Sequence, residues 1–451
     1  MRPPSPESQD PAGSVRLALL LGGIQLLAFS ERFLLTVVAQ PLKLDLDLTD
    51  AQLGFLQGSA FVLLHALGMP AWGEIADRGH RRALLVAGIL LWSAAGIAFG
   101  LAGPFLLLVV ARMLLGLGQA VVAPAALSLL AYRSPPGRLG RGVSWLTAGA
   151  SLGRSLALLA GGALLALLTA IGGLSLPIAG HLPPWRALLI IACLPNLLAL
   201  VAALNIAEPP ARRSIQARAR RARAWAWMLR HRTLYLALFG AAACAVLVAQ
   251  TLAAWAPTFY VRTHGLTPAE SGVRLGLVML LIAPMGHLAG GHVLDKAGAS
   301  GRRIAAVRML CTGLLLVPPC SAMMTLSASL PVSLAGFGLL AAVLGLTSPA
   351  ALAFLQFLTP AAMRGFVSAV FIAGVTLTAL GLGPISVGIL NDRVFGPAAV
   401  GSAMLTVFIA TALIGATLTY VLGRPARRTR RASLLEPAFA ETGTADAPHR
   451  P

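Results

Sequence analysis

Two apolar runs follow each other in the N-terminal half of the chain: ALLVAGILLWSAAGIAFGL (83–101) and FLLLVVARMLLGLGQAVVAPAALSLLA (105–131). Each is long enough for an α-helix to cross the bilayer core, which takes about 20 residues. Neither alternates apolar with polar positions, as the strands of an outer-membrane barrel do. Both runs therefore predict transmembrane helices.

The rest of the chain has the same character. Of its 451 residues, 57% are hydrophobic and 11% are charged, whereas a soluble domain carries about 25% charged residues. The fold class predicted is an all-α membrane protein, with twelve transmembrane helices in two pseudo-symmetric six-helix bundles. The predicted spans are 16–41, 51–73, 83–101, 105–131, 143–170 and 184–206, then 233–260, 270–293, 304–327, 332–358, 365–390 and 397–422.

The two halves resemble each other. GEIADR (73–78) ends the second predicted span and GHVLDK (291–296) the eighth, each with Gly, then Asp four residues on, then a base. ALSLL…P…RGVS (126–144) likewise resembles ALAFL…P…RGFVS (351–368). Repeated halves are typical of transporters, whose substrate sites form near the midplane where the two bundles meet.

Composition divides the chain into five segments. Residues 1–15 are predicted to be a disordered N-terminus, and the first apolar run is too long for the core of a signal peptide. Residues 16–206 and 233–423 form the predicted bundles, 207–232 an Arg-rich linker, and 424–451 a polar tail.

The charge distribution predicts the orientation. The net charge of +20 comes from 35 Lys and Arg against 15 Asp and Glu, and the basic residues lie in loops between the apolar runs. That placement sets membrane topology and gives no reason to expect nucleic acid as a partner. Loops at 78–82, 133–141, 302–303 and 364 share one side with both termini, whereas 44–50 on the other side is acidic. By the positive-inside rule, both termini are predicted to lie in the cytoplasm. The predicted location is the inner (cell) membrane, which the chain crosses several times.

The linker changes abruptly to Arg and Ala, in EPPARRSIQARARRARAWAWMLRHR (208–232). It predicts an amphipathic helix on the inner membrane surface, with arginines on headgroups and Trp225 and Trp227 at the interface. A regulatory lipid or protein site is the alternative.

Two motifs resemble those of the major facilitator superfamily. GEIADRGHRR (73–82) resembles the loop between spans two and three, with His80 where the family pattern has Gly. ARMLLGLGQA (111–120) resembles the fourth-span motif, with Arg112 as its membrane-buried arginine and Gln119 where an acid is often found.

Three further stretches resemble the spinster-like branch of that superfamily. They are ERFLLTVVAQPLKLDLDLTDAQLGFLQG (31–58), WAPTFYVRTHGLTPAESGVRLGL (255–277) and MRGFVSAVFIAGVTLTALGLGPISVGILNDRVFG (363–396). The resemblance implies two bundles that rock about a central site and give alternating access to a small molecule, such as a lysolipid-like amphiphile.

Glu31 is the only carboxylate well inside a predicted span, where a charge costs at least about 2.5–3.5 kcal/mol. Arg112 reaches a similar depth of about 10 Å in span four, so the two can pair. Glu31 then either takes a proton when the arginine engages an anionic substrate, or forms a static ion pair between the spans. Arg32 shares that depth but points about 100° away.

Arg154 interrupts GASLGRSLALLAGG (149–162) in mid-span, where many exporters of the resembled family have Gly-Pro. It is predicted to hold an anionic head by a bidentate contact, to replace Arg112 beside Glu31, or to face backbone carbonyls. His65 either relays protons or packs as a hydrogen-bonded core residue. Glu31, Arg32, Arg112 and Arg154 are candidate substrate contacts, together with the predicted cavity liners Gln119, Gln250, Trp255, Tyr260 and Gln356.

A conformational latch is predicted where the second span ends. An Asp there can accept hydrogen bonds from helix N-terminal amides and pair with an arginine across the bundle interface. A loop that only sets topology is the alternative. The residues assigned to this latch and to its weaker copy are Asp77, Arg78, Arg81, Arg82, Asp295, Lys296 and Arg364.

Other functions are disfavoured by missing motifs. No HExxH, paired acids or Ser/His/Asp set suggests a membrane enzyme, and no GxxxxGK[ST] loop suggests an ATP-driven pump. The four cysteines lie in apolar runs, and His287 and His292 lack neighbouring ligands, so neither a metal nor a cofactor is expected. A receptor that kept the fold is a further alternative.

The sequence therefore predicts a secondary transporter for a small organic anion or amphiphile, with proton antiport through Glu31. An uncoupled facilitator, or a drug or metabolite exporter of the same superfamily, is the alternative. The expected partners are the substrate, protons and membrane lipids, and the expected state is a monomer.

Overall fold

The computed structural model describes residues 11–77, 79–134, 139–177, 180–208, 217–360 and 363–433. These residues include twelve helical segments that are long and apolar enough to cross a membrane, and all twelve predicted spans are confirmed. The largest shift is in the eleventh span, which ends at Phe395 and not at 390. The protein is a multi-pass membrane protein of two six-helix bundles.

The N-terminal bundle contains the first six spans. Three of these are interrupted, so that they consist of two helices each. A short antiparallel hairpin, which the sequence did not predict, joins the fifth span to the sixth. The elements are α1 (Pro11–Val37), α2 (Ala39–Asp45), α3 (Asp50–Gln57), α4 (Ser59–Asp77), α5 (Arg81–Leu101), α6 (Phe105–Gln119), α7 (Val122–Arg133), α8 (Leu139–Ala170), β1 (Leu174–Leu176), β2 (Gly180–Leu182), α9 (Pro184–Ile191) and α10 (Asn196–Leu204).

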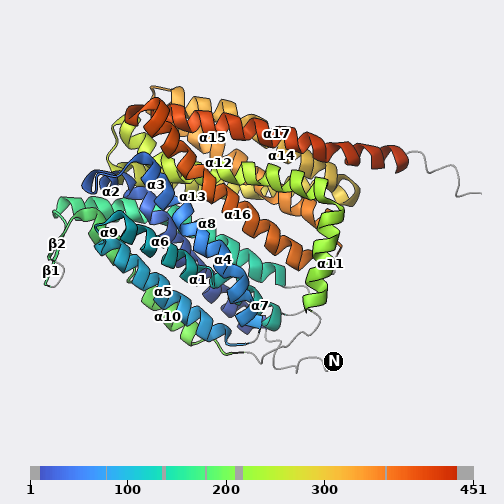
Figure 1. The fold of residues 1–451 in the computed structure, drawn as a ribbon, viewed down its shortest axis with the longest axis horizontal. Coiled ribbons are helices and arrows are strands. Elements are labelled where there is room, and N and C mark those ends of the chain that lie inside the picture. The colour runs from blue at the N-terminus through green and yellow to red at the C-terminus, as the bar shows by residue number, and fades with distance from the viewer. Residues whose placement is uncertain are drawn as a thin grey trace, which may run out of the picture.

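The C-terminal bundle contains the last six spans. Its long helices are mostly continuous, and a π-helical turn and a 3₁₀ turn join the last two. The elements are α12 (Arg232–His264), α13 (Pro268–Lys296), α14 (Gly298–Leu326), α15 (Leu330–Leu358), α16 (Arg364–Leu390), η3 (Asn391–Phe395), η4 (Pro397–Ala399) and α17 (Val400–Ser433). Figure 1 shows the two bundles side by side, with the N-terminal bundle in blue and green and the C-terminal bundle in yellow to red.

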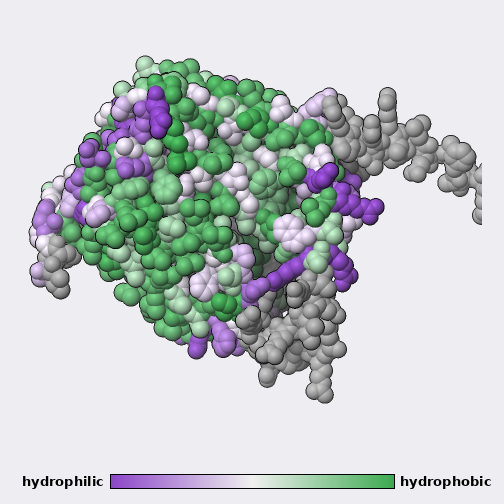
Figure 2. Space-filling model, viewed as in Figure 1, coloured by the Kyte–Doolittle hydropathy of each residue, from purple (hydrophilic) through white to green (hydrophobic). Residues whose placement is uncertain are grey.

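The two ends of the molecule differ and are named here by their elements. The hairpin end carries β1–β2, α2 and η3, on the left of Figure 1. The linker end carries the linker helix α11 (Ala217–Arg230), on the right. Figure 2 shows a broad apolar surface between these ends, with hydrophilic residues gathered at both. Leu106 on α6, Leu198 on α10 and Leu288 on α13 are more than two-thirds exposed, as expected of side chains that face lipid.

The linker helix α11 bridges the two bundles. Arg221 pairs with Glu74 of the N-terminal bundle at 2.9 Å, and Trp227 Nε1 donates to the Leu358 carbonyl of the C-terminal bundle at 3.3 Å. The predicted linker helix is thus present, although residues 209–216 lie outside the described part of the chain. Trp227 is half-buried, and its placement at the membrane interface stays a prediction.

Two seams join the bundles near the hairpin end. Seam one packs α3 and α4 against α16, and seam two packs α8 against α13. Seam one is so close that a Cβ on Gly54 would lie 2.4 Å from the Pro384 carbonyl oxygen. In seam two, a Cβ on Gly276 would lie 2.5 Å from the Leu159 amide nitrogen. Small residues let helix backbones approach in this way.

The seams are related by the repeat of the two halves. LTDAQLGFLQG (48–58) starts the second span and LTPAESGVRLG (266–276) the eighth, with Gly as the seventh and eleventh residue of each stretch. Each helix begins with a capping box. The Thr side chain accepts a hydrogen bond from the backbone amide three positions on, and the side chain of that residue accepts one from the Thr backbone amide. The second helix of each half therefore packs against the fifth helix of the other.

Candidate functional site

A cavity of about 210 Å³ lies between the bundles. It is lined by α1 and α8 of the N-terminal bundle and by α12, α13, α14 and α15 of the C-terminal bundle. On α12 its lining extends from Pro257, close to the seam-one residue Trp255, to Ala242, so the cavity extends from the level of the seams toward the linker end. The seams thus separate the cavity from the hairpin end.

The two walls of the cavity differ in chemistry. The N-terminal bundle contributes Arg154, whose Nε has no hydrogen-bond partner among the described residues. The C-terminal bundle contributes mostly apolar side chains, such as Leu275, Met279 and Phe337. Gln250 lies on this second wall, and its Oε1 is also unpartnered in the described chain. The cavity has a cationic side and an apolar side.

A second buried arginine lies behind the cationic wall. Phe33 lines the cavity, and the guanidinium carbons of Arg32 and Arg154 lie 5.3 Å and 4.8 Å from its ring centroid. Arg32 also lies 4.4 Å from the ring centroid of Phe61. Aromatic faces attract cations at such distances. The Nη2 of Arg32 has no hydrogen-bond partner within the described residues.

Glu31 is buried on another face of α1. Asn196 Nδ2 donates to its Oε2 at 2.9 Å, and the Cys193 thiol donates to its Oε1 at 3.5 Å. A Cβ on Gly96 of α5 would lie 2.2 Å from Oε1, so the carboxylate occupies the space that this glycine leaves free. Glu31 does not line the cavity.

The structure does not form the Glu31–Arg112 ion pair that the sequence allowed. No salt bridge joins them among the described residues. Arg112 instead donates from Nε to the Leu56 carbonyl at 3.2 Å and from Nη2 to the Arg32 carbonyl at 2.7 Å. Leu56 belongs to the last turn of α3, where carbonyls lack intrahelical partners. Arg112 thus ties α6 to α1 and α3, and Arg154 does not replace it beside Glu31.

The other candidates from the N-terminal bundle lie outside the cavity lining. His65 is half-buried, stacked on Phe61 with ring centroids 5.0 Å apart, and its Nδ1 is 3.0 Å from the Gly116 carbonyl oxygen. Gln119 is buried, and its Nε2 has no hydrogen-bond partner in the described chain. A proton relay through His65 stays a prediction.

The candidates from the C-terminal bundle divide similarly. Gln250 lines the cavity, but Trp255 is fully buried behind seam one and donates to the Pro384 carbonyl at 2.8 Å. Tyr260 is fully buried and hydrogen-bonded to Ser333. Gln356 donates to Ser368 at 3.0 Å, outside the cavity lining.

The latch residues of the N-terminal bundle meet an acid that the sequence did not single out. Glu208 accepts hydrogen bonds from the backbone amides of Arg81 and Arg82 at 2.8 Å and 2.6 Å, at the start of α5. A carboxylate is stabilised at a helix N-terminus. Arg81 is buried, and its Nε donates to Ser128 at 2.8 Å within the same bundle. Arg78 and the side chain of Asp77 lie outside the described part of the structure.

The copy of the latch in the C-terminal bundle is exposed. Asp295 and Lys296 lie on the surface at the end of α13. Arg364 donates from Nε to the Thr359 carbonyl at 3.1 Å, within its own bundle. A latch between the bundles therefore stays a prediction, which applies to a state in which the linker end is closed.

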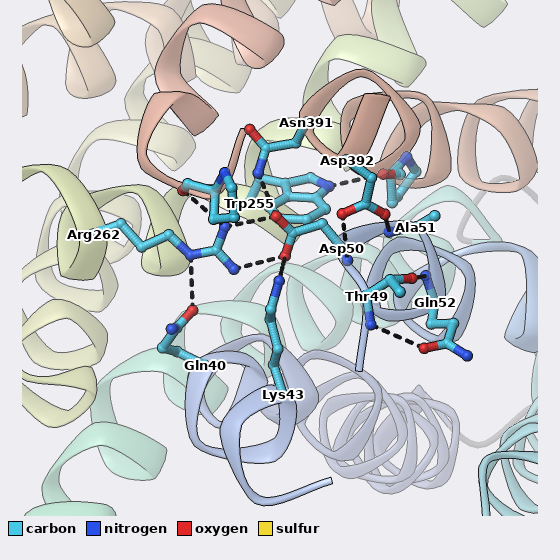
Figure 3. A network of polar contacts seen from close by, with 12 residues as sticks. Gln40, Lys43, Thr49, Asp50, Ala51, Gln52, Trp255, Arg262, Asn391 and Asp392 are labelled. Atoms are coloured by element: carbon cyan, nitrogen blue, oxygen red, sulfur yellow. Dashed lines mark hydrogen bonds and ion pairs between the residues drawn. The ribbon is translucent and has the colours of Figure 1, made fainter. Parts of the chain in front are cut away.

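A buried ion cluster at the hairpin end was not predicted from the sequence (Figure 3). Asp50 of α3 is fully buried and accepts two hydrogen bonds from Arg262 of α12, at 2.7 Å and 2.8 Å. Lys43 lies 2.5 Å from the same carboxylate, and the Asn391 side chain also donates to it. Arg262 and Asn391 come from the opposite bundle, so the cluster joins the bundles beside seam one.

A second acid completes this cluster. Asp392 accepts from the backbone amides of Asp50 and Ala51 at 3.0 Å and 2.7 Å, and so caps α3 from the other bundle. The capping box at Thr49 and Gln52 was the sequence signal that Asp50 begins a helix. Its partners lie 212 and 341 positions away, which no local pattern indicates.

Two pseudo-symmetric six-helix bundles around a central cavity define the fold of a secondary transporter. The chain belongs to the Major Facilitator Superfamily, whose pattern matches residues 21–371. A crystal structure of a bacterial homolog of the human lysosomal transporter spinster, in an inward-facing and unoccupied conformation, has the same fold, with a TM-score of 0.78. It is 22% identical over 94% of this chain and 98% of its own.

Two curated relatives fall in the same superfamily. An MFS-type efflux pump of Mycolicibacterium smegmatis is 26% identical over 422 residues, which cover 89% of this chain and 91% of the pump. Protein spinster homolog 1 of Xenopus tropicalis is 23% identical over 58% of this chain and 49% of its own length. The predicted superfamily and the resemblance to the spinster-like branch are confirmed, and the family and fold are those of transporters.

Proposed function

We propose that this transporter carries a small organic anion or an anionic, lysolipid-like amphiphile by alternating access, coupled to protons. The observation that carries the proposal is the division of the cavity into the Arg154 wall and the apolar wall of α12, α13 and α15. A single-chain amphiphile with an anionic head is likewise divided into a charged part and an apolar part. Its head would lie against Arg154 and its chain against the apolar wall.

The buried charges support an anionic head group. Arg32 and Arg112 are buried in the N-terminal bundle and Arg154 is half-buried on the cavity wall, with Glu31 as a buried carboxylate of the same bundle. Arg112 uses its donors on backbone carbonyls, whereas Arg32 and Arg154 each keep an unpartnered nitrogen among the described residues. A buried donor without a partner is costly. Arg154 lines the cavity, so a substrate oxyanion there would satisfy its Nε.

The seams support alternating access. They close the hairpin end while the cavity extends toward the linker end. The second state of the cycle would open both seams and the Asp50 cluster, and would close the linker end. The predicted latch would form at the linker end. Its residues are Asp77, Arg78, Arg81 and Arg82, together with Asp295, Lys296 and Arg364.

Proton coupling is assigned to Glu31, a buried carboxylate held by the neutral side chains of Asn196 and Cys193. A carboxylate without an arginine partner can take up and release a proton more readily than one in an ion pair. We assign the linker end to the cytoplasm, because Arg82, Arg133 and Arg364 lie at helix ends there. We also assign the protein to the inner membrane, as a monomer.

Export of apolar drugs is the second candidate. The similarity to the mycobacterial efflux pump extends over 89% of this chain. The large apolar wall of the cavity would suit such compounds, and Arg154 would then be dispensable.

The experiment uses purified protein in liposomes with a trapped pH dye and an imposed pH gradient. Organic anions, lysophospholipids and cationic drugs are screened with the parent, Glu31→Gln and Arg154→Gln. We expect an anion or anionic lysolipid to drive proton movement, Glu31→Gln to abolish it, and Arg154→Gln to weaken the apparent affinity about tenfold or more. Arg141→Gln, an exposed arginine of the same helix, should behave as the parent does.

Other outcomes would contradict parts of the proposal. Labelled lysolipid that crosses without proton movement would make the protein an uncoupled facilitator. Proton movement driven by cationic drugs, unchanged in Arg154→Gln, would favour the drug exporter.

A further inference from the structure

The sixth span is interrupted next to Glu31. Helix α9 ends at Ile191 and α10 begins at Asn196, and Pro195 in between has no N–H with which to continue the helix. Asn196 and Cys193, on either side of this proline, are 3% and 6% exposed. The interruption directs both side chains toward the Glu31 carboxylate on α1.

This carboxylate lies in a pocket of its own, separate from the cavity. Phe33 and Thr36 of α1 line the cavity, and they lie about 200° and 140° around the helix from Glu31. The pocket is formed by Asn196, Cys193 and the space above Gly96 of α5. The proposed proton site and the proposed substrate site therefore lie on different faces of one helix.

The charged and titratable groups around this pocket lie outside α1. They are Arg112 on α6 and the Cys193 thiol between α9 and α10. None of the arginines forms a salt bridge with Glu31 in the described chain. The closest contact of the carboxylate is the 2.9 Å hydrogen bond from the neutral Asn196 amide.

We propose that Asn196 is the positioning residue for the proton site: it sets the proton affinity of Glu31 and holds the carboxylate turned away from the cavity. The inference rests on the proposed proton coupling. A proton that binds either carboxylate oxygen removes the charge that strengthens the Asn196 hydrogen bond. The neutral acid is then held less firmly, and α1 is free to move. Loss of the proton restores the charge and the hydrogen bond.

The test measures substrate-driven proton movement in liposomes as a function of pH. Asn196→Leu removes the donor at similar volume, so the ionised form of Glu31 loses a charge-assisted hydrogen bond. We expect the midpoint of the pH profile to move to higher pH by about one to two units. Asn196→Ser, which is too short to reach the carboxylate, should shift the midpoint in the same direction and serves if Asn196→Leu does not fold. Cys193→Ala should give a smaller shift, because a thiol is a weak donor.

Two controls separate positioning from general damage. Asn205→Leu changes an exposed asparagine at the C-terminal cap of α10, whose side chain donates to the Val201 carbonyl, and should leave the profile unchanged. Asn196→Leu combined with Glu31→Gln should show no pH-dependent component beyond that of Glu31→Gln alone.

Two results have different meanings. Glu31→Gln that abolishes coupling, together with an Asn196→Leu midpoint equal to that of the parent, would overturn the role of Asn196 and leave the proposed function intact. Glu31→Gln with the coupling and pH profile of the parent would overturn the proposed coupling itself.

Discussion

Seam one and seam two share their glycine spacing, but only seam one carries buried ions. A Cβ on Gly54 in seam one and on Gly272 in seam two would each approach the backbone of the opposite bundle to less than 3 Å. The residue after the capping Thr is Asp50 in the first half and Pro268 in the second. Asp50 draws Arg262, Lys43 and Asn391 into a buried cluster, whereas Pro268 can accept no such partner.

This difference indicates different tasks for two related contacts. Glycine packing alone lets backbones approach closely but gives little preference for one register, so seam two suits a contact that slides or rocks. A buried carboxylate that is bonded to Arg262, Lys43 and Asn391 has one good geometry, and breaking the cluster exposes unpaired charges. Seam one therefore suits a gate that is either closed or open.

The largest expected effect comes from Asp50→Asn, which would leave seam one as poor in ions as seam two. Removing one partner of a buried ion pair costs about 3–5 kcal/mol, because the Arg262 side chain would stay buried and the Lys43 side chain partly buried without their anion. We expect the closed hairpin end to lose most of its population. Spin labels on Leu44→Cys and Val394→Cys, two exposed positions on opposite bundles, would report a longer distance.

The control for this change is Asp45→Asn. Asp45 lies 3.6 Å from Arg186 within the N-terminal bundle and is partly exposed, so its loss should cost about 0–1 kcal/mol. Equal label distances in Asp50→Asn and Asp45→Asn would mean that the ion cluster does not hold the gate.

A smaller effect is expected when a methyl group is added to seam one. A Cβ on Gly388 would lie 2.2 Å from the Asp50 carbonyl oxygen, a backbone atom that cannot turn aside. Gly388→Ala should therefore weaken closure by about 1–3 kcal/mol. Gly381→Ala, on the same helix with its nearest contact at 3.7 Å, should transport as the parent does. A Gly388→Ala variant with the transport rate and label distance of Gly381→Ala would show that close packing of seam one is dispensable.

The smallest effect separates the two helix starts. Loss of a capping hydroxyl costs about 0.5–2 kcal/mol. Both helices begin with a capping box. The first amides of α3 also donate to Asp392 of the other bundle, and this second acceptor shares the cap with Thr49. Thr49→Ala should therefore lower the unfolding temperature less than Thr267→Ala does. A larger drop for Thr49→Ala would indicate that Asp392 does not share the cap.

Much of the fold followed from the sequence, because spans in a membrane depend on local composition. A run of about 20 apolar residues must form a helix there, since its backbone groups find no other partners. The spans were predicted in this way. The repeat was predicted from motifs that recur in the two halves, and the superfamily from the resemblance of such motifs to those of a known family. The β1–β2 hairpin was not, because three-residue strands have no clear pattern of their own.

The site was predicted less completely. The sequence identified Glu31 and Arg154 as charges in apolar runs. The structure buries Glu31 and places Arg154, half-buried, on the cavity wall. It allowed a Glu31–Arg112 pair because depth along a helix is readable from residue counts. Direction around the helix and competing partners are not, and Arg112 bonds carbonyls instead.

The sequence by itself determined that the chain spans the membrane twelve times as a two-fold repeat of the superfamily. Only the tertiary structure decided which polar side chains meet. Asp50 and Arg262 stand 212 positions apart, and Glu31 and Asn196 stand 165 apart. The physical reason is that bilayer insertion depends on each helix separately, whereas a buried charge finds its partner through the packing of helices against one another.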